Sequence, residues 1–234
     1  LISKGRLSEA RRTMDRFKAS AVVASVEPVT MPVEATAPSG TMTNADFVRR
    51  TVFLVIAYFL TPWATSGFTV LSGAVLVQKG INPQDSILYV GISTFGPLIG
   101  TFLAGGIVDR LERRVALAVL AGLLMLTGLV FGVVTDPVSL MTSGLIFNLL
   151  VNLLTPVLVL YAAELFTTDR RAQGTSWGWA STRVGSALVP LALLPLLKAQ
   201  GSLAMFVVIA GTLIAFVAVI LVFGPRGNAG RTVA

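Results

Sequence analysis

Arg183 is the residue whose position in this sequence points most directly to binding chemistry. It lies within the long apolar segment 174–197, about nine residues, or roughly 13 Å at helical rise, past Gly174. If this segment spans a membrane, a charge there costs at least about 2.5–3.5 kcal/mol and needs water or a partner. We predict that Arg183 binds an anionic substrate group such as a carboxylate, or pairs with an acidic side chain. A snorkelling or purely structural arginine is the alternative.

Four further polar or aromatic side chains are candidates for the same binding cavity. Asn148 and Asn152 are four residues apart, so their amides share one face of a helix. They line the predicted cavity or, equally well, join two helices by hydrogen bonds. Tyr58 and Trp63 flank Pro62, and a proline break at membrane depth often exposes backbone to a cavity. We therefore add Tyr58 and Trp63 to the predicted substrate site.

The composition lacks the commonest tools of enzymes and does not fit a nucleic-acid-binding protein. The 234 residues are 54% hydrophobic and only 12% charged, whereas soluble domains carry about 25% charged residues. Cysteine and histidine are absent, which removes the commonest nucleophile, proton shuttle and metal ligands. The net charge of +7 sits in loops and at the N-terminus, not on one nucleic-acid-binding face. We expect no catalytic residues, no metal, no cofactor and no nucleic acid.

Six apolar segments carry these candidate residues. Each is about as long as the roughly 20 residues that a membrane-spanning helix needs, and none alternates like a barrel strand. In lipid, a helix is then the remaining structure in which each backbone N–H and C=O group finds a hydrogen-bond partner. The segments are residues 51–77, 86–108, 115–134, 138–163, 174–197 and 203–223.

Basic residues are rich in every second turn between these segments. Eight Lys and Arg precede residue 51, three lie between the second and third segments, two between the fourth and fifth, and two follow the sixth. Of the other three turns, the first holds Lys79, the second holds no basic residue and the third holds Lys198. Cytoplasmic loops carry the excess of Lys and Arg. The pattern predicts a multi-pass protein of the cell membrane with both termini in the cytoplasm.

The rest of the chain divides into short segments. Residues 1–18 are predicted to form an amphipathic cytoplasmic helix near anionic headgroups, and residues 19–46, with three prolines, a flexible linker. Residues 47–224 are the six-helix transmembrane domain and residues 225–234 a cytoplasmic tail. Because Leu1 begins inside a predicted loop helix, we expect six further spans upstream.

The turn before the third segment carries a recognisable motif. It matches the pattern Gly-x-x-x-Asp-Arg-x-Gly-x-Arg-Arg through Gly105, Asp109, Arg110, Arg113 and Arg114, with Glu112 where glycine is usual. This pattern is the loop signature of the major facilitator superfamily of transporters, which the chain resembles. The resemblance implies an all-α membrane protein, with six transmembrane helices forming one half of a facilitator fold as two inverted three-helix repeats.

Two other stretches carry the same resemblance. The opening segment resembles one that follows the sixth span of sugar-porter-like facilitators, through Leu1, Lys4, Gly5, Arg6, Glu9 and Ala10. These transporters also have a glutamate at the inner end of the tenth span and an arginine seven residues later, as do Glu164 and Arg171. This chain would therefore be the C-terminal half, with the N-terminal six-helix half missing.

The resemblance groups the charged turns into a cytoplasmic gate. It comprises Gly105, Asp109, Arg110, Arg113, Arg114, Glu164 and Arg171. Exposed ion pairs contribute about 0–1 kcal/mol each, but a network that forms in one state biases a two-state equilibrium. The alternative is that these charges lie in water and only fix the orientation of the helices in the membrane.

The expected function is secondary active transport by alternating access. The chain lacks the Pro-Glu-Thr ending of sugar porters and has Thr155-Pro156-Val157 in place of their Gly-Pro-x-x-Trp pattern. With Arg183, these departures favour a small organic acid, moved by proton symport. A sugar or polyol porter is the alternative within the superfamily. A six-span channel subunit or membrane enzyme is the alternative from another class, although no turn holds a re-entrant pore segment.

Overall fold

The chain folds as a bundle of long helices in a computed structural model, which describes residues 42–82, 87, 89, 91, 93, 95–107 and 112–225. Among these residues no strand is present. The helices are α2 (Asn44–Gln78), α4 (Phe95–Ile107), α5 (Arg113–Val133), α6 (Pro137–Glu164) and α7 (Arg171–Phe223). Four of them, all except α4, are long and apolar enough to cross a membrane. The all-helical, multi-pass class expected from the sequence is confirmed.

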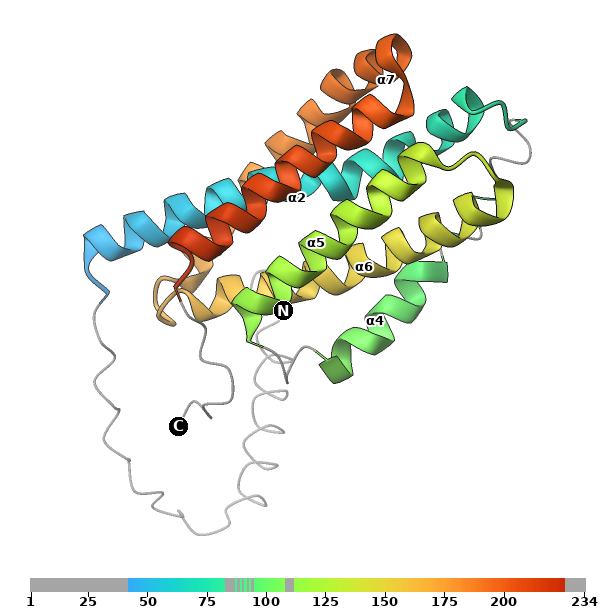
Figure 1. Cartoon of the computed structure of the whole chain (residues 1–234). Helices are drawn as coiled ribbons and strands as arrows, with labels where there is room; N and C mark the ends of the chain where they lie inside the picture. The colour runs from blue at the N-terminus through green and yellow to red at the C-terminus, as the bar shows by residue number, and fades with distance from the viewer. Residues whose placement is uncertain are drawn as a thin grey trace, which may run out of the picture. The chain divides into compact units, whose positions relative to one another are not determined.

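Helix α7 is two helical segments joined at Gly201. Its 53 residues would measure about 80 Å if straight, far more than the roughly 30 Å of a bilayer core. Gly201 has φ 87° and ψ 178°, a backbone conformation that is essentially restricted to glycine. The chain therefore reverses here, and Figure 1 shows α7 folded back on itself. The two segments correspond to the predicted apolar segments 174–197 and 203–223.

Local sequence explains where the other helices begin. Asp136 accepts a hydrogen bond from the Ser139 backbone N–H at 3.0 Å, and Pro137 occupies the first turn, where a missing N–H costs nothing. Helix α2 begins at Asn44, so residues 44–46 of the predicted linker are helical. The predicted helix at residues 1–18 lies outside the described residues.

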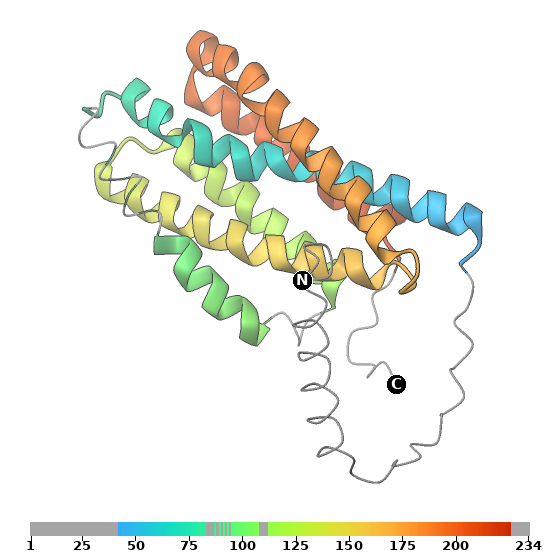
Figure 2. The same cartoon turned by 180° about the vertical axis from the view of Figure 1, so that it is seen from behind.

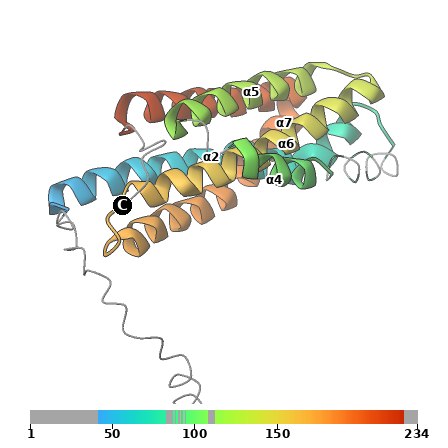
Figure 3. The same ribbon diagram turned by 90° about the horizontal axis from the view of Figure 1, so that it is seen from below.

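The helices pack as neighbours in a fixed pattern. Helix α2 packs mainly on α7, α4 on α6, and α5 on both α6 and α7. Figures 1 and 2 show α4 against α6 at one side of the bundle, and Figure 3 shows α5 beside the last part of α7 in a layer above α2 and α6. This arrangement leaves the first segment of α7 on the side of α2 that is remote from α4.

Aromatic rings fill the centre of the bundle. Phe68 of α2 stacks on Phe147 of α6 with ring centroids 4.2 Å apart. Phe131 of α5 lies 5.0 Å from Phe68 and 5.5 Å from Phe206 of α7, centroid to centroid. One cluster thus joins four helices. In lipid, such van der Waals packing replaces the hydrophobic effect as the force that holds helices together.

Candidate functional site

Charged side chains connect the helix ends that the sequence predicts to be cytoplasmic. The Arg113 Nε at the start of α5 lies 3.2 Å from the Glu164 Oε1 at the end of α6. The two side chains are 12% and 31% exposed. This partial burial makes the ion pair stronger than one in open water, and it links α5 to α6.

Two more arginines from this end bind backbone carbonyls. The Arg50 guanidinium on α2 donates to the Leu165 carbonyl at 2.6 Å, just after α6. Arg114 donates to the Leu221 carbonyl in the last turn of α7, where helical carbonyls lack partners. A positive charge at a helix C-terminus also stabilises the helix dipole. The four helices α2, α5, α6 and α7 are therefore tied together at one end.

The other predicted gate residues are placed less closely. Gly105 lies in α4, whereas Asp109 and Arg110 lie outside the described residues. Arg171 is exposed and begins α7, and Glu164 forms its ion pair with Arg113. Among the gate residues that the structure describes, Arg113 and Glu164 form an ion pair.

The opposite end of the bundle is held by Lys79 and Gln78. The Lys79 ammonium donates to the Phe131 carbonyl at 2.6 Å and to the Val134 carbonyl at the end of α5. Burial lowers the pKa of Lys79 from its ordinary value. Gln78 Nε2 donates to the Leu197 carbonyl at 2.6 Å, near the α7 reversal. Sequence reasoning treated Lys79 only as a loop charge.

Asn148 and Asn152 lie on the face of α6 that meets α4. Each amide donates to a backbone carbonyl one turn earlier, Asn148 to Gly144 at 3.2 Å and Asn152 to Asn148 at 2.9 Å. A Cβ atom added to Gly96 would lie 3.0 Å from the Asn148 Cβ, and one added to Gly100 3.1 Å from the Asn152 Cβ. The absence of a side chain at these two glycines therefore lets α4 approach α6 closely.

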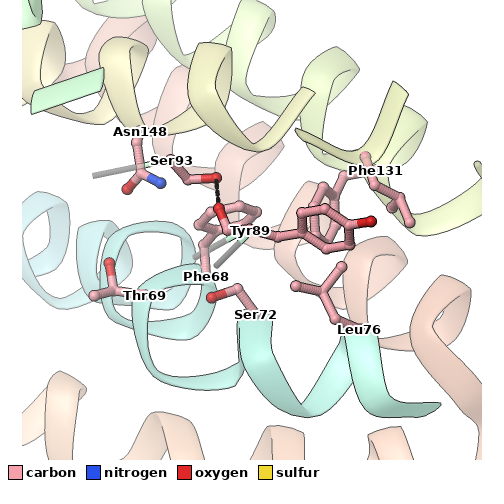
Figure 4. A pocket seen from close by; sticks show the side chains of 9 residues that line it. Phe68, Thr69, Ser72, Leu76, Tyr89, Ser93, Phe131 and Asn148 are labelled. Carbon is pink, nitrogen blue, oxygen red and sulfur yellow. Dashed lines mark hydrogen bonds between the residues drawn. The ribbon is translucent and has the colours of Figure 1, made fainter. Parts of the chain in front are cut away.

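A small cavity with a mainly apolar lining and a few polar side chains adjoins Asn148. Its volume of about 40 Å³ accommodates roughly two or three water molecules. Figure 4 shows polar side chains from three parts of the chain around it, with the Ser93 hydroxyl donating to the Tyr89 carbonyl at 2.9 Å. The lining residues are Phe68, Thr69, Ser72, Leu76, Tyr89, Ser93, Phe131, Leu140 and Asn148.

Sequence reasoning identified one polar member of this cavity and missed four. Thr69 and Ser72 are three residues apart, and Tyr89 and Ser93 are four apart, so each pair shares a helix face. Polar pairs at this spacing within apolar segments were the available signal. Asn148 was found by the same spacing relative to Asn152.

Tyr58 and Trp63 lie on either side of Pro62 in α2. Proline has no N–H, so the Tyr58 carbonyl loses its helical partner; the Thr182 hydroxyl of α7 donates to it at 3.2 Å. Tyr58 is buried, and its ring lies edge to face with Trp179, centroids 5.7 Å apart. Trp63 is partly buried, and its indole N–H has no hydrogen-bond partner among the described residues.

Arg183 is exposed on α7, one residue after Thr182. The neighbouring Gly185 lies against α2 so closely that an added Cβ would be 2.9 Å from the Phe59 carbonyl. Ser186 also meets α2, with its hydroxyl oxygen 3.2 Å from that of Ser66. Arg183 therefore projects from the rim of the tightly packed α2–α7 contact.

Comparison with known proteins places this arrangement among transporters. The family model for the Major Facilitator Superfamily matches residues 54–233. The chain is 25% identical to the niacin transporter NiaP of Acinetobacter baylyi over 99% of this chain and 54% of the relative. It is 24% identical to the inner membrane metabolite transport protein YdjE of Escherichia coli, over 77% of this chain and 40% of the relative.

Solved structures show the same fold at low identity. A crystal structure of the peptide transporter POT in complex with alafosfalin matches with a TM-score of 0.68 at 18% identity, over 78% of this chain and 40% of that chain. A POT family transporter in complex with 5-aminolevulinic acid matches with a TM-score of 0.64 at 16% identity, over 76% and 39%. The chain spans about half the length of the relatives it matches.

Proposed function

Because the chain belongs to the Major Facilitator Superfamily, we propose that it forms the C-terminal six-helix half of a transporter that moves a small organic acid by alternating access with proton symport. The proposed membrane is the cell membrane, with the basic helix ends and both termini on the cytoplasmic side. The substrate would lie between this half and an N-terminal half of similar size. The coverage of the relatives, about half of each, supports this division.

Six spans are supported by the way the helices divide. The long helices α2, α5 and α6 supply three, and the two segments of α7 on either side of Gly201 supply two more. The sixth would be α4 with the residues before it, since residues 87, 89, 91 and 93 are also helical. Two sets of three such helices would form the inverted repeats of a transporter half.

An organic acid is supported chiefly by Arg183. The residue lies about 18 Å along α7 from Arg171, deep within the span, yet its side chain is exposed. Exposure to lipid would be costly, so this side of α7 must face the water-filled path or the other half. A guanidinium there recognises a carboxylate through paired charge-assisted hydrogen bonds. The name of the NiaP relatives fits, because niacin is a pyridine carboxylic acid.

Proton coupling would involve residues beyond those in this site. The acidic side chains among the described residues, Asp46, Glu112, Asp136, Glu164 and Asp169, lie at helix ends or turns. None lies in the middle of a described span. We propose that the proton-accepting carboxylate belongs to the other half.

The arginine network supports a cytoplasmic gate. In the proposed mechanism, Arg113, Glu164 and Arg114 keep one end of this half rigid, so that it rocks as a body. Asp109, Arg110 and Arg171 would then complete contacts across the gate. Ion pairs that form in one state and part in the other bias the alternation between inward-open and outward-open states.

Uptake by cells that express the carrier tests the proposal. Removing charge-assisted hydrogen bonds costs about 1.5–3 kcal/mol, so Arg183→Gln should lower uptake of labelled nicotinate roughly 10- to 100-fold. Lys198→Gln is the matched control, because Lys198 is also an exposed cation on α7 but lies near the Gly201 reversal. Equal uptake by the wild type and Arg183→Gln, at equal expression, would refute recognition of the acid by Arg183.

A further inference from the structure

A surface patch around Arg183 combines a charge, an aromatic ring and two hydroxyls. We define the Arg183 patch as Trp179, Arg183 and Ser186 of α7 with Ser66 of α2. The three α7 residues are spaced four and three apart and share one face of the helix. Ser66 joins them because its hydroxyl oxygen lies 3.2 Å from that of Ser186.

The Trp179 ring is held on one side by the Tyr58 ring. Its ring lies edge to face with Tyr58 at a centroid distance of 5.7 Å and an interplanar angle of 73°. Tyr58 is only 3% exposed and its backbone carbonyl accepts from Thr182, so the supporting ring is fixed by the α2–α7 contact. Trp179 nevertheless remains 44% exposed. An indole fixed on one side and open on another is ready to receive a second planar ring.

Anchoring at the membrane–water interface is the alternative role of this tryptophan, and the helix face that it shares with Arg183 argues against it. Anchoring tryptophans sit at the membrane–water interface, whereas Trp179 lies about 12 Å along α7 from Arg171. Because Trp179 shares a face with Arg183, a lipid-facing indole would bring the guanidinium into hydrocarbon as well. The two side chains therefore face the same aqueous or protein environment.

From this geometry we infer that the Arg183 patch binds a planar aromatic carboxylate. The carboxylate pairs with the Arg183 guanidinium, the ring stacks on Trp179 one helical turn away, about 6 Å along the axis, and the serine hydroxyls face a ring heteroatom or substituent. The inference rests on the proposed function and narrows its substrate class. An aliphatic acid of equal charge uses Arg183 but gains nothing from the indole, whereas an aromatic pair contributes about 0.5–1.5 kcal/mol beyond area burial.

Substrate selectivity tests the inference. KM values for uptake of nicotinate and of pyruvate are measured in cells that express the carrier, and the ratio of the two is compared between variants. We expect Trp179→Leu to raise the nicotinate KM relative to the pyruvate KM by about 2- to 12-fold. Trp179→Phe, which keeps a ring, should restore most of the ratio. Trp177→Leu is the matched control, because Trp177 is 57% exposed but makes no ring contact among the described residues.

Other outcomes of these measurements would overturn the inference. An unchanged ratio in Trp179→Leu, or an equal change in Trp177→Leu, overturns the aromatic inference and leaves the transport of an acid intact. If Arg183→Gln alters the uptake of neither acid, recognition of the acid by Arg183 fails, and the inference fails with it. A changed ratio in Trp179→Leu that Trp179→Phe does not restore attributes the effect to lost packing, and also overturns the inference.

Discussion

Adding one methyl group at Gly96 should separate α4 from α6. A Cβ atom built on Gly96 would lie 2.7 Å from the Leu145 carbonyl oxygen and 2.9 Å from the Leu149 nitrogen. Both are backbone atoms of α6, so no flexible side chain can move aside. The helices must shift apart, and the Asn148 Cβ, which would lie 3.0 Å from the added atom, would lose its close contact with α4.

The expected magnitude follows from two opposing terms. Overpacking a well-packed contact costs about 1–3 kcal/mol, whereas replacing glycine by alanine within a helix gains up to about 1 kcal/mol. Gly122→Ala in α5 isolates the second term, because no atom lies within 4 Å of its added Cβ. We expect Gly96→Ala to be about 1–3 kcal/mol less stable than Gly122→Ala. For a domain of this size the difference in Tm is roughly 2–12 °C.

Thermal unfolding of the detergent-purified protein, followed by circular dichroism, measures this difference. Gly211→Ala in α7 serves as a second control with open space around the added Cβ. If the three alanine variants melt together, α4 and α6 do not approach as closely as the structure shows. The packing role of the Gly96–Asn148 contact would then be refuted.

Two other predictions concern the hydrogen bonds that join helices. Thr182→Val removes the hydroxyl that serves the Tyr58 carbonyl and should lower the free energy of unfolding by about 1–3 kcal/mol, whereas Thr127→Val, whose hydroxyl bonds within its own exposed helix turn, should change it little. Lys79→Met leaves the last carbonyls of α5 without their donor and should lower the Tm of the purified protein; an unchanged Tm would show that water replaces the ammonium there.

The sequence predicted the helices because composition and length dominate that choice in lipid. Uncharged runs of about 20 residues have few options other than a spanning helix, and Gly201 marks the reversal that divides α7. Gly96 and Gly100 are four residues apart and therefore share the helix face that approaches α6 closely. These features depend on local sequence, which a single chain displays directly.

Pairings between distant segments could not be read in the same way. The family resemblance placed Arg113 and Glu164 in one gate but did not say which charges pair. The structure pairs these two, fifty-one residues apart, because the ends of α5 and α6 meet. In the sequence, Lys79 is simply a basic residue in a loop. Its hydrogen bond to the Phe131 carbonyl depends on where α5 ends. Such contacts depend on helix packing, which the order of residues along one helix does not specify.

The side of the membrane on which each turn lies tests the account most directly. This chain has no cysteine, so a cysteine introduced into it is the one thiol within these 234 residues that a membrane-impermeant maleimide can label. Thr135 lies exposed between α5 and α6, and Thr168 lies exposed between α6 and α7. We predict that Thr135→Cys labels in intact cells and Thr168→Cys labels only after the cells are permeabilised. Labelling of Thr168→Cys in intact cells would contradict the proposed bundle with its arginine network on the cytoplasmic side.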